Sequence, residues 1–362
     1  MKFRLSNIIL FLFVSLVFLN SCSLFRSDGI IDADDPRIQY GGRIDRTDPK
    51  NIRFDWPGVY FKTVFEGSSI ALRLKDGNNT YNIFIDGRFS HVLTTNYTDS
   101  VYTVAKNLKD SRHVIKVTKR TEGYFGIAQF SGFILDPGSD LVRVNLSYKR
   151  KIEFIGDSYV AGFGNEGSSP DCVFSKETEN NYYAYGPVLA RKFRAEYSVI
   201  AASGIGVLHN FGDTLLFSKK PMPALFNKTC LNDSLLWDFS EWQPDLVLVR
   251  LGRNDFAGKP FPLGKVFKNA YRKFILNIRQ NYPNAHIFAL CGPAKNDPHY
   301  IFINSVINNL KHTKKDNKLH FVQIKAKLIR PDDFGCQWHP NKLGHQKIAN
   351  YLEPIIRKVK KW

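Results

Sequence analysis

The chain of 362 residues is long enough for two domains or one large one, and its hydrophobic content of 43% excludes a disordered protein. Five cysteines are too few for a disulfide scaffold. The formal net charge of +18 is compatible with nucleic acid, an anionic membrane surface or an acidic substrate as partner. Because no zinc-finger spacing, RNP sequence or basic heptad region accompanies this charge, we expect no nucleic-acid partner.

The N-terminus has the pattern of an export signal. Two basic residues precede an apolar run over residues 8–19, which is too short to span a bilayer comfortably and ends in small and polar residues. Cys22 follows, and this arrangement resembles the lipobox of bacterial lipoproteins, which implies cleavage before Cys22 and a lipid anchor; an ordinary signal peptide is the alternative. We assign residues 1–22 to the signal and the lipidated cysteine and residues 23–35 to a tether. The mature protein is then expected on a membrane, facing the periplasm or exposed on the cell surface.

Export places the chain in an oxidising compartment, where four cysteines remain after lipidation. Cys291 ends an apolar strand pattern and is expected to be a buried thiol outside any disulfide. Cys172 and Cys230 both lie in loop-like sequence after predicted strands. We therefore expect Cys172 and Cys230 to pair, although four cysteines, with Cys336 as the last, allow three pairings.

Residues 36–146 are predicted to form an all-β domain. Short runs rich in β-branched and aromatic residues alternate with turn signals such as Asp-Gly. The predicted strands are 59–65, 70–74, 81–85, 113–118, 126–135 and 141–146. Many short strands at this spacing indicate an antiparallel sandwich or jelly roll. Trp56, Tyr60 and Tyr124 are candidates for stacking on sugar rings, but each one is expected to be packed instead.

Residues 147–362 change to an alternation of strands and helices. The predicted strands are 152–155, 197–202, 246–251, 286–290 and 320–324. The predicted helices are 182–193, 263–280, 300–311 and 344–359. Because the strands are continuously apolar and alternate with helices, the pattern predicts a parallel sheet covered by helices on both faces, which is a three-layer α/β/α domain.

Polar residues and glycines follow the ends of these strands. Ser158 follows the first strand, Gly204 the second and Asn254 the third, while His339 precedes the last helix. The carboxyl ends of parallel strands share one edge, where open α/β sheets bind their ligands. There Ser158 is a candidate nucleophile and His339 its base. The main-chain N–H groups of Ser158 and Gly204 and the amide of Asn254 are candidates for an oxyanion hole. The structural alternatives are a turn serine and a helix-capping asparagine.

Four other polar residues near these segments are assigned structural roles. Asp157 and Asp255 are expected to hold turns rather than to take part in chemistry. His209 and His345 are expected on the surface or in a helix. The candidate chemistry therefore rests on one serine and one histidine, with no metal ligands predicted.

The four segments occur in an order and at a spacing that resemble the sequence blocks of the SGNH (GDSL-type) hydrolases over residues 150–360. These segments are Gly156-Asp157-Ser158, Ser203-Gly204-Ile205-Gly206, Gly252-Arg253-Asn254-Asp255 and Trp338-His339-Pro340. The resemblance is closer to carbohydrate esterase family 2, which joins a jelly-roll domain to an SGNH domain and also resembles this chain at 156–164, 178–180, 237–239 and 335–340. It implies a serine esterase that removes O-acetyl groups from xylan- or glucomannan-type polysaccharides through an acyl-enzyme, with no cofactor or metal.

Two positions depart from the pattern of this family. Arg253 stands where a threonine is usual, and it is expected to face solvent rather than the mouth of a cleft. Cys336 and Gln337 occupy the two positions where relatives carry the aspartate that orients the histidine. The open candidates for this role are Asp332, Asp333, the side-chain oxygen of Gln337 and a main-chain carbonyl. We therefore expect a Ser–His dyad with a weak or non-acidic third member.

Other functions remain open at this point. The same fold is compatible with a lipase, a thioesterase or a peptidoglycan O-acetyl esterase. The missing carboxylate is also compatible with a weakened enzyme that only binds glycans. An α/β-hydrolase is disfavoured, because the chain has no Gly-x-Ser-x-Gly elbow. No oligomeric state is predicted.

Overall fold

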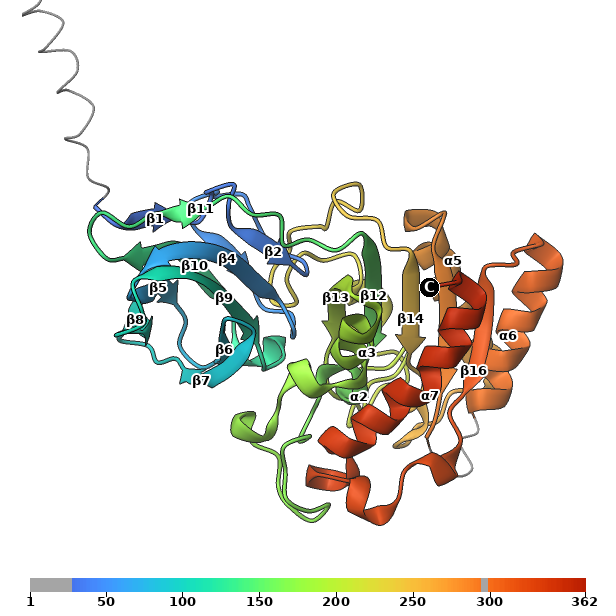
Figure 1. Ribbon diagram of the computed structural model, residues 1–362. Helices are drawn as coiled ribbons and strands as arrows, with labels where there is room; N and C mark the ends of the chain where they lie inside the picture. Colours follow the sequence, from blue (N-terminus) through green and yellow to red (C-terminus); the bar gives the residue numbers. More distant parts are fainter. Residues whose placement is uncertain (1–27, 294–298) are drawn as a thin grey trace, which may run out of the picture.

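The computed structural model describes residues 28–293 and 299–362. The predicted export signal, the lipidated Cys22 and the first part of the predicted tether lie outside these residues. Figure 1 shows a β-sandwich domain beside a domain built on a parallel sheet. Among the described residues, no helix combines the length and the apolar character needed to cross a lipid bilayer.

The N-terminal domain is a sandwich of two antiparallel sheets, as the sequence predicts (Figure 1). In one sheet the order is β1-β10-β5-β8, with β3 also paired to β10. Its strands are β1 (Ile30–Asp32), β3 (Ile52–Phe54), β5 (Ile70–Lys75), β8 (Val101–Ala105) and β10 (Ala128–Leu135). In the other sheet the order is β11-β4-β9-β6-β7, with β2 also paired to β4. Its strands are β2 (Gln39–Gly41), β4 (Tyr60–Gly67), β6 (Thr80–Ile85), β7 (Arg88–Thr94), β9 (Ser111–Lys119) and β11 (Leu141–Val142).

Aromatic side chains hold the two sheets together. Phe61 on β4 stacks on Phe130 of β10, with ring centroids 4.2 Å apart, and Phe133 meets Phe130 edge-on. All three side chains are buried in one core. Burial of a side chain of this size contributes about 1.5–3 kcal/mol to the free energy of unfolding. The period-2 burial of β9, where Ile115 and Val117 point inward, follows from the pleat of a strand with one covered face.

The sandwich begins earlier and ends earlier than the strand patterns predict. Strand β1 lies inside residues 23–35, the predicted tether, and Ile31 and Ala33 are buried. The apolar run there is too short to be recognised as a strand without its partner β10. At the other end only Leu141 and Val142 of the predicted strand 141–146 pair with β4.

The second domain has the predicted three layers. Its five-stranded parallel sheet has the order β13-β12-β14-β15-β16. The strands are β12 (Arg150–Gly156), β13 (Ala195–Ala201), β14 (Leu246–Arg250), β15 (His286–Cys291) and β16 (Leu319–Gln323). The helices are α2 (Ser158–Ala161), α3 (Tyr185–Phe193), α4 (Met222–Leu225), α5 (Gly264–Asn281), α6 (His299–Lys314) and α7 (Lys342–Lys360). Helices α3 and α7 pack on one face of the sheet, and α5 and α6 pack on the other (Figure 1).

Short 3-10 turns carry much of the remaining chain. They are η1 (Gly123–Phe125), η2 (Lys176–Thr178), η3 (Asn181–Tyr183), η4 (Asn254–Phe256), η5 (Ala326–Leu328), η6 (Pro331–Asp333) and η7 (Cys336–Trp338). The helix predicted at 182–193 is divided into η3 and α3, because Ala184 is extended. Turns η4 and η7 include or adjoin the candidate residues of the site.

Buried polar contacts join the two domains. Arg43 of the sandwich domain is fully buried and donates from Nη1 to the main-chain oxygen of Phe226 and from Nη2 to Glu153 Oε1, at 3.2 Å. Asn82 and Asn180 exchange two amide hydrogen bonds of 3.0 and 3.2 Å across the same boundary. Because unpaired polar groups are costly in such places, these contacts specify how the domains dock.

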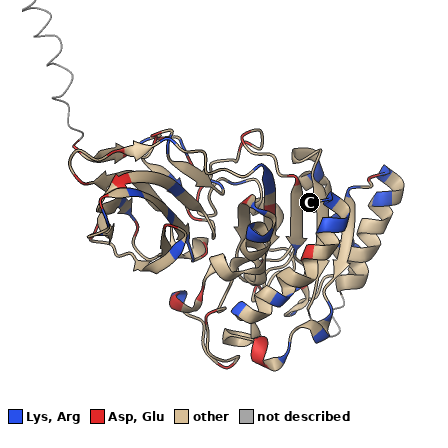
Figure 2. Ribbon diagram, in the orientation of Figure 1, with Lys and Arg blue, Asp and Glu red and all other residues tan. Residues whose placement is uncertain are grey.

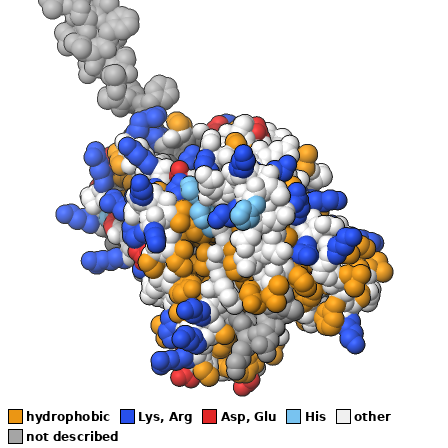
Figure 3. All heavy atoms as spheres, turned by 90° about the vertical axis from the view of Figure 1, so that its right-hand side faces the viewer, with side chains coloured by type: hydrophobic (Ala, Val, Ile, Leu, Met, Phe, Trp, Pro, Cys, Tyr) orange, Lys and Arg blue, Asp and Glu red, His pale blue; other side chains and the backbone are white. Residues whose placement is uncertain are grey.

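The positive charge is spread widely. Figure 2 shows Lys and Arg on strands, helices and loops of both domains. On the face that carries α6, basic side chains surround a surface that also includes apolar side chains (Figure 3). A distribution of this kind gives a diffuse positive field rather than one stripe of charge.

Candidate active site

The ends of three neighbouring strands meet at one edge of the parallel sheet. Strand β12 lies between β13 and β14, and the register places Gly156 beside Ala201 and Arg250. The segments that follow these strands therefore emerge together, with Ser158, Gly204 and Asn254 at their tips. This is the carboxyl edge, where the strand pattern predicts the site.

Ser158 and His339 form a hydrogen-bonded pair. The Nε2 atom of His339 lies 2.8 Å from Ser158 Oγ, although 181 positions separate the two residues in the chain. Ser158 is only 8% exposed, and the imidazole ring packs against Phe163 and Tyr159, with centroids 4.5 and 5.4 Å away. The geometry is that of a nucleophile and its base within proton-transfer distance.

The segment around Ser158 is held by a buried ion pair. Asp157 caps α2 by accepting the N–H of Tyr159, and both of its oxygens lie 2.6 Å from Arg250 Nη1. The Arg250 guanidinium stacks over the Tyr159 ring at 3.7 Å. Asp157 thus holds the turn, as predicted. Sequence reasoning missed Arg250, for which the available signal was a basic residue at the end of an otherwise apolar strand.

The histidine is oriented by the main chain. Its Nδ1 lies 2.9 Å from the carbonyl oxygen of Gln337, which can only accept, so Nδ1 carries the proton and Nε2 accepts from Ser158. The side chain of Gln337 is exposed and does not fill the role. Asp333 instead bonds Lys347 Nζ and the N–H of Arg330. Asp332 is exposed, and its main-chain oxygen accepts from Asn341.

Of the four open candidates for the third member, the structure selects the main-chain carbonyl. A sequence pattern does not reveal this acceptor, because every residue has a carbonyl. The peptide is aimed at the ring by unusual backbone angles, with φ of +52° at Gln337 and +58° at Trp338. Burial lowers the pKa of His339 below its ordinary value, and the Gln337 carbonyl opposes this shift only in part.

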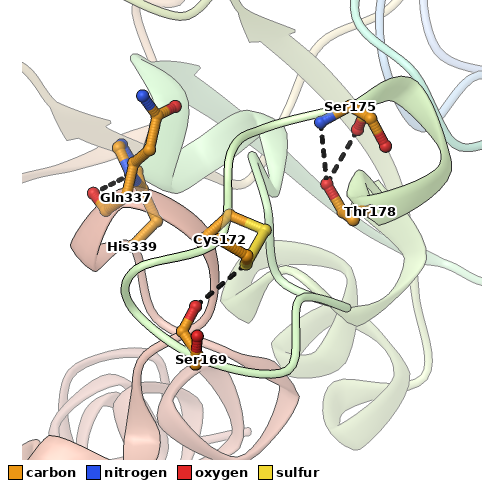
Figure 4. Close-up of a disulfide and its surroundings, with 7 residues drawn as sticks. Ser169, Cys172, Ser175, Thr178, Gln337 and His339 are labelled. Atoms are coloured by element: carbon orange, nitrogen blue, oxygen red, sulfur yellow. Dashed lines mark hydrogen bonds between the residues drawn. A yellow bond between two sulfur atoms is a disulfide. The ribbon is translucent and has the colours of Figure 1, made fainter.

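A disulfide ties the histidine segment to the loop after Ser158. Cys172 and Cys336 are bonded, so the predicted pairing of Cys172 with Cys230 is wrong (Figure 4). Cys230 is a buried thiol whose pKa is raised by burial, and Cys291 is also a buried thiol, as expected. Spacing alone does not show that residues 164 positions apart meet. Gly167 adjoins the bridge, where a Cβ would lie 2.3 Å from the sulfur of Cys336.

Gly204 and Asn254 lie on adjoining segments. The Asn254 side chain donates from Nδ2 to the carbonyl oxygen of Ile205 at 2.8 Å, which leaves the second amide hydrogen for another acceptor. Gly204 has φ of +76°, a conformation that favours glycine. Asp255 is buried and accepts the N–H groups of residues 207, 208 and 209, so it holds a turn as predicted, while burial raises its pKa to about 6.

Several secondary expectations are settled by burial. His209 and His345 are fully buried, so neither is a surface residue; His345 lies in α7 and accepts the N–H of Tyr185. Trp56 and Tyr60 are packed, as expected. Tyr124 is 54% exposed, so the expectation that it is packed is wrong; its hydroxyl donates to the carbonyl of Ser203, beside the candidate site. Arg253 is exposed, as predicted. Within residues 28–293 and 299–362, no group of three or more His, Cys, Asp and Glu side chains is arranged to hold a metal ion.

The fold and this Ser–His pair define a serine hydrolase built on a three-layer α/β/α domain. Residues 154–347 match the GDSL-like Lipase/Acylhydrolase family, and residues 40–144 match the Carbohydrate esterase 2 N-terminal family. The chain belongs to the GDSL-like acylhydrolases, and within them to carbohydrate esterase family 2. This confirms the resemblance stated from the sequence.

Similar proteins agree with this assignment. The "Cellulase/esterase CelE" of Acetivibrio thermocellus is 33% identical over 91% of this chain, and the match spans 40% of that relative's length. An "Acetylxylan esterase / glucomannan deacetylase" of Cellvibrio japonicus is 29% identical over 89% of this chain and 91% of its own. A solved family two carbohydrate esterase from Clostridium thermocellum in complex with cellohexaose superposes with a TM-score of 0.83 at 32% identity, covering 90% of this chain and 99% of that one.

Proposed function

We propose that this protein is a serine esterase that removes O-acetyl groups from xylan- or glucomannan-type polysaccharides. The observation that carries the proposal is the 2.8 Å contact between Ser158 Oγ and His339 Nε2, with His339 Nδ1 donating to a carbonyl. The names of the similar proteins support the substrate class, since one is an acetylxylan esterase and glucomannan deacetylase.

The reaction begins with attack of Ser158 Oγ on the acetyl carbonyl carbon. His339 Nε2 takes the hydroxyl proton as the new carbon–oxygen bond forms. Negative charge develops on the carbonyl oxygen, where the N–H groups of Ser158 and Gly204 and the second amide hydrogen of Asn254 are the donors that we assign to it. As the first residue of α2, Ser158 has an N–H that the helix does not use.

The tetrahedral intermediate then collapses. The bond between the acetyl carbon and the sugar oxygen breaks, and the imidazolium of His339 returns the proton to that oxygen. Water, deprotonated by the same Nε2, attacks the acyl-serine, and acetate leaves as Ser158 regains its proton. The balance of atoms and protons needs no cofactor. A neutral carbonyl stabilises the imidazolium less than a carboxylate does, so the dyad relies more heavily on the oxyanion donors.

Exposed aromatic rings beside His339 and Gly204 suit a carbohydrate. Trp338 directly precedes His339 and is 58% exposed. Phe211 is 63% exposed, and its main-chain N–H donates to the carbonyl of Gly204. Aromatic rings provide flat apolar surfaces for the apolar face of a pyranose. We assign Trp338 and Phe211 to the walls of the sugar site, with the acetyl group directed at Ser158.

The test is turnover of p-nitrophenyl acetate by the mature protein and by its Ser158→Ala variant. We expect clear hydrolysis by the first and a loss of at least about 10³-fold in the second, as when a catalytic serine is removed. Equal rates in the two proteins would contradict the proposal. Acetate release across a panel of acetylated xylans, glucomannans and peptidoglycan then identifies the polymer.

Two alternatives are resolved by the same set of experiments. A lipase or thioesterase would prefer long acyl chains in a p-nitrophenyl ester series, whereas an acetyl esterase loses activity beyond acetate and propionate. The neutral acceptor on His339 Nδ1 favours, as a second candidate, a weakened enzyme that binds glycans. Binding to acetylated glucomannan without acetate release would support that candidate.

We also propose that Cys22 carries a lipid and holds the protein on a membrane. The support is the basic, apolar and small-residue pattern of residues 1–22. From Cys22 to the start of β1 at Ile30 the chain reaches at most about 28 Å, so an anchored sandwich domain would stay close to the bilayer. Detergent-phase partitioning of the full chain and its Cys22→Ser variant tests this; partitioning of both into the aqueous phase would contradict it.

A further inference from the structure

A turn of the sandwich domain holds the residue before Gly204 from two sides. Glu122 Oε2 accepts the main-chain N–H of Ser203 at 2.5 Å. The hydroxyl of Tyr124 donates to the main-chain oxygen of the same residue at 3.2 Å. Glu122 directly precedes turn η1, which contains Tyr124, and both belong to the first domain. The two consecutive peptide groups on either side of the Ser203 Cα are therefore held by the sandwich domain: Glu122 binds the one before it and Tyr124 the one after it.

The contacts on the far side of Gly204 come from the hydrolase domain. The N–H of Phe211 donates to the Gly204 carbonyl at 2.8 Å, and Asn254 donates to the Ile205 carbonyl at 2.8 Å. The direction of the Gly204 N–H is thus set on one side by the hydrolase domain and on the other by Glu122 and Tyr124. The Gly204 N–H and the Ser203 carbonyl belong to the same planar peptide group. Tyr124 binds that carbonyl, so it also fixes the direction of the Gly204 N–H.

Turn η1 is itself held firmly. Glu122 is 2% exposed, and its N–H donates to Glu179 Oε2 at 3.1 Å. The carbonyl of Gly123 accepts from Asn232 Nδ2 at 2.5 Å, so a residue of the hydrolase domain also binds this turn of the sandwich domain. A Cβ on Gly123 would lie 3.1 Å from Leu231 Cβ, a close fit of the two surfaces. Burial raises the pKa of Glu122 to about 7. Burying a carboxyl group is costly, and here the buried Glu122 carboxyl binds the main chain of Ser203. This indicates that the position of Ser203 is important.

We propose that Glu122, with Tyr124, is a positioning residue for the oxyanion hole, and that the sandwich domain is thereby part of the catalytic unit. The inference rests on the proposed function, because it takes Gly204 as an oxyanion donor. Glu122 does not touch the substrate; it acts by holding Ser203. Donors aimed in advance at the developing charge account for about 10²–10³-fold in kcat each, so loss of their aim reduces kcat by part of that factor.

The experiment compares three variants with the wild type on p-nitrophenyl acetate. Glu122→Ala removes the acceptor and is expected to lower kcat about 10- to 100-fold with KM nearly unchanged. Glu122→Gln keeps an oxygen for the Ser203 N–H and is expected to retain kcat within about threefold, since an amide oxygen is also an acceptor. Tyr124→Phe alters an exposed ring, so it folds normally, and it is expected to lower kcat about two- to fivefold.

The matched control is Asn82→Ala, which removes the two cross-domain hydrogen bonds to Asn180 without touching Ser203. It is expected to lower Tm and leave kcat close to that of the wild type. Affinity for an alkyl boronic acid, which forms a tetrahedral adduct with the serine, should fall in parallel with kcat in Glu122→Ala and stay constant in Asn82→Ala. A purely structural role of Glu122 would not produce this parallel.

The outcomes separate the inference from the proposed function. If the wild type hydrolyses the ester, Ser158→Ala does not, and folded Glu122→Ala and Tyr124→Phe keep the wild-type kcat, the inference alone is overturned. An equal fall in kcat for Asn82→Ala also overturns it. If Glu122→Ala does not fold, Tyr124→Phe and the retained activity of Glu122→Gln decide. If wild type and Ser158→Ala are equally inactive, the proposed function fails and the inference with it.

Discussion

His339 Nδ1 lies 2.9 Å from the main-chain oxygen of Gln337, so the base of the candidate site is oriented by a peptide group two residues upstream. The acceptor is uncharged, and it is presented by two consecutive residues with positive φ. The imidazole therefore has a defined tautomer, while the uncharged acceptor on Nδ1 stabilises the protonated ring less than a carboxylate at that position would. Three of the following predictions depend on this segment.

Replacing the side chain of Gln337 should leave catalysis largely intact. Gln337→Ala keeps the carbonyl that binds Nδ1, so we expect kcat/KM within about threefold of the wild type, whereas His339→Ala should lose at least about 10³-fold. Ester hydrolysis by the two purified variants provides the measurement. A loss in Gln337→Ala as large as in His339→Ala would show that the side chain is needed.

The acid limb of the pH profile should lie at low pH. Burial depresses the pKa of His339 below 6.5, and the base must be neutral to accept a proton, so activity persists as the pH falls to the depressed pKa and is lost below it. We expect the midpoint of kcat/KM for p-nitrophenyl acetate on the acid side to fall below pH 6.5. A midpoint above 6.5 would instead indicate a negative group that stabilises the imidazolium.

Breaking the Cys172–Cys336 bridge should affect stability and activity together. The bond closes a loop of 164 residues, and removal of such a bridge costs about 2–5 kcal/mol of unfolding free energy. Because Cys336 lies three residues before His339, Cys172→Ser should also lower kcat. The test is Tm and kcat with and without reductant, using Cys291→Ala as a control that keeps the bridge. Reductant should change the wild type and not Cys172→Ser; the opposite pattern would rule out the pairing.

Removing the Arg43 side chain should destabilise the interface between the two domains. Arg43→Ala leaves Glu153 buried without its cation, and breaking a buried pair in this way costs about 3–5 kcal/mol. The exposed pair Arg112–Glu66 serves as the comparison, because Arg112→Ala should cost less than about 1 kcal/mol. Urea unfolding of each variant gives the free energies, and adding Glu153→Gln to Arg43→Ala should recover part of the loss. Similar costs for both arginines would show that burial does not set the effect.

The sequence was most informative for strands and helices whose own pattern of apolar residues is sufficient to locate them. Strand β14 is a continuous apolar run up to Arg250, and β12 is interrupted only by Glu153 over residues 152–155, so both were located within two residues of their observed ends. Ser158 followed from its place after the first of these runs, and His339 from its place before the last helix. Strand β7 was missed because most of it is exposed at a sheet edge, and β1 to β3 were missed because three residues make no pattern.

Three features that depend on contacts between distant segments were not predicted. The pairing of Cys172 with Cys336 needs the loop after Ser158 folded against η7. The role of Arg250 depends on β12 and β14 being neighbours, which places its guanidinium on Asp157. The acceptor for His339 depends on backbone angles at Gln337, and no residue type encodes a carbonyl. In each case the side chain was visible in the sequence, while its partner was set by tertiary structure.

The disulfide also has a consequence for a protein exposed to proteases. Ser158 lies before Cys172 and His339 after Cys336. The disulfide therefore gives a second covalent connection between the two reacting groups that bypasses the chain between the two cysteines. A single backbone cut anywhere between the two cysteines leaves nucleophile and base on one covalently connected molecule. Such nicked protein would migrate as one band on a non-reducing gel and as two after reduction, with Ser158 and His339 still joined until the sulfur bond is broken.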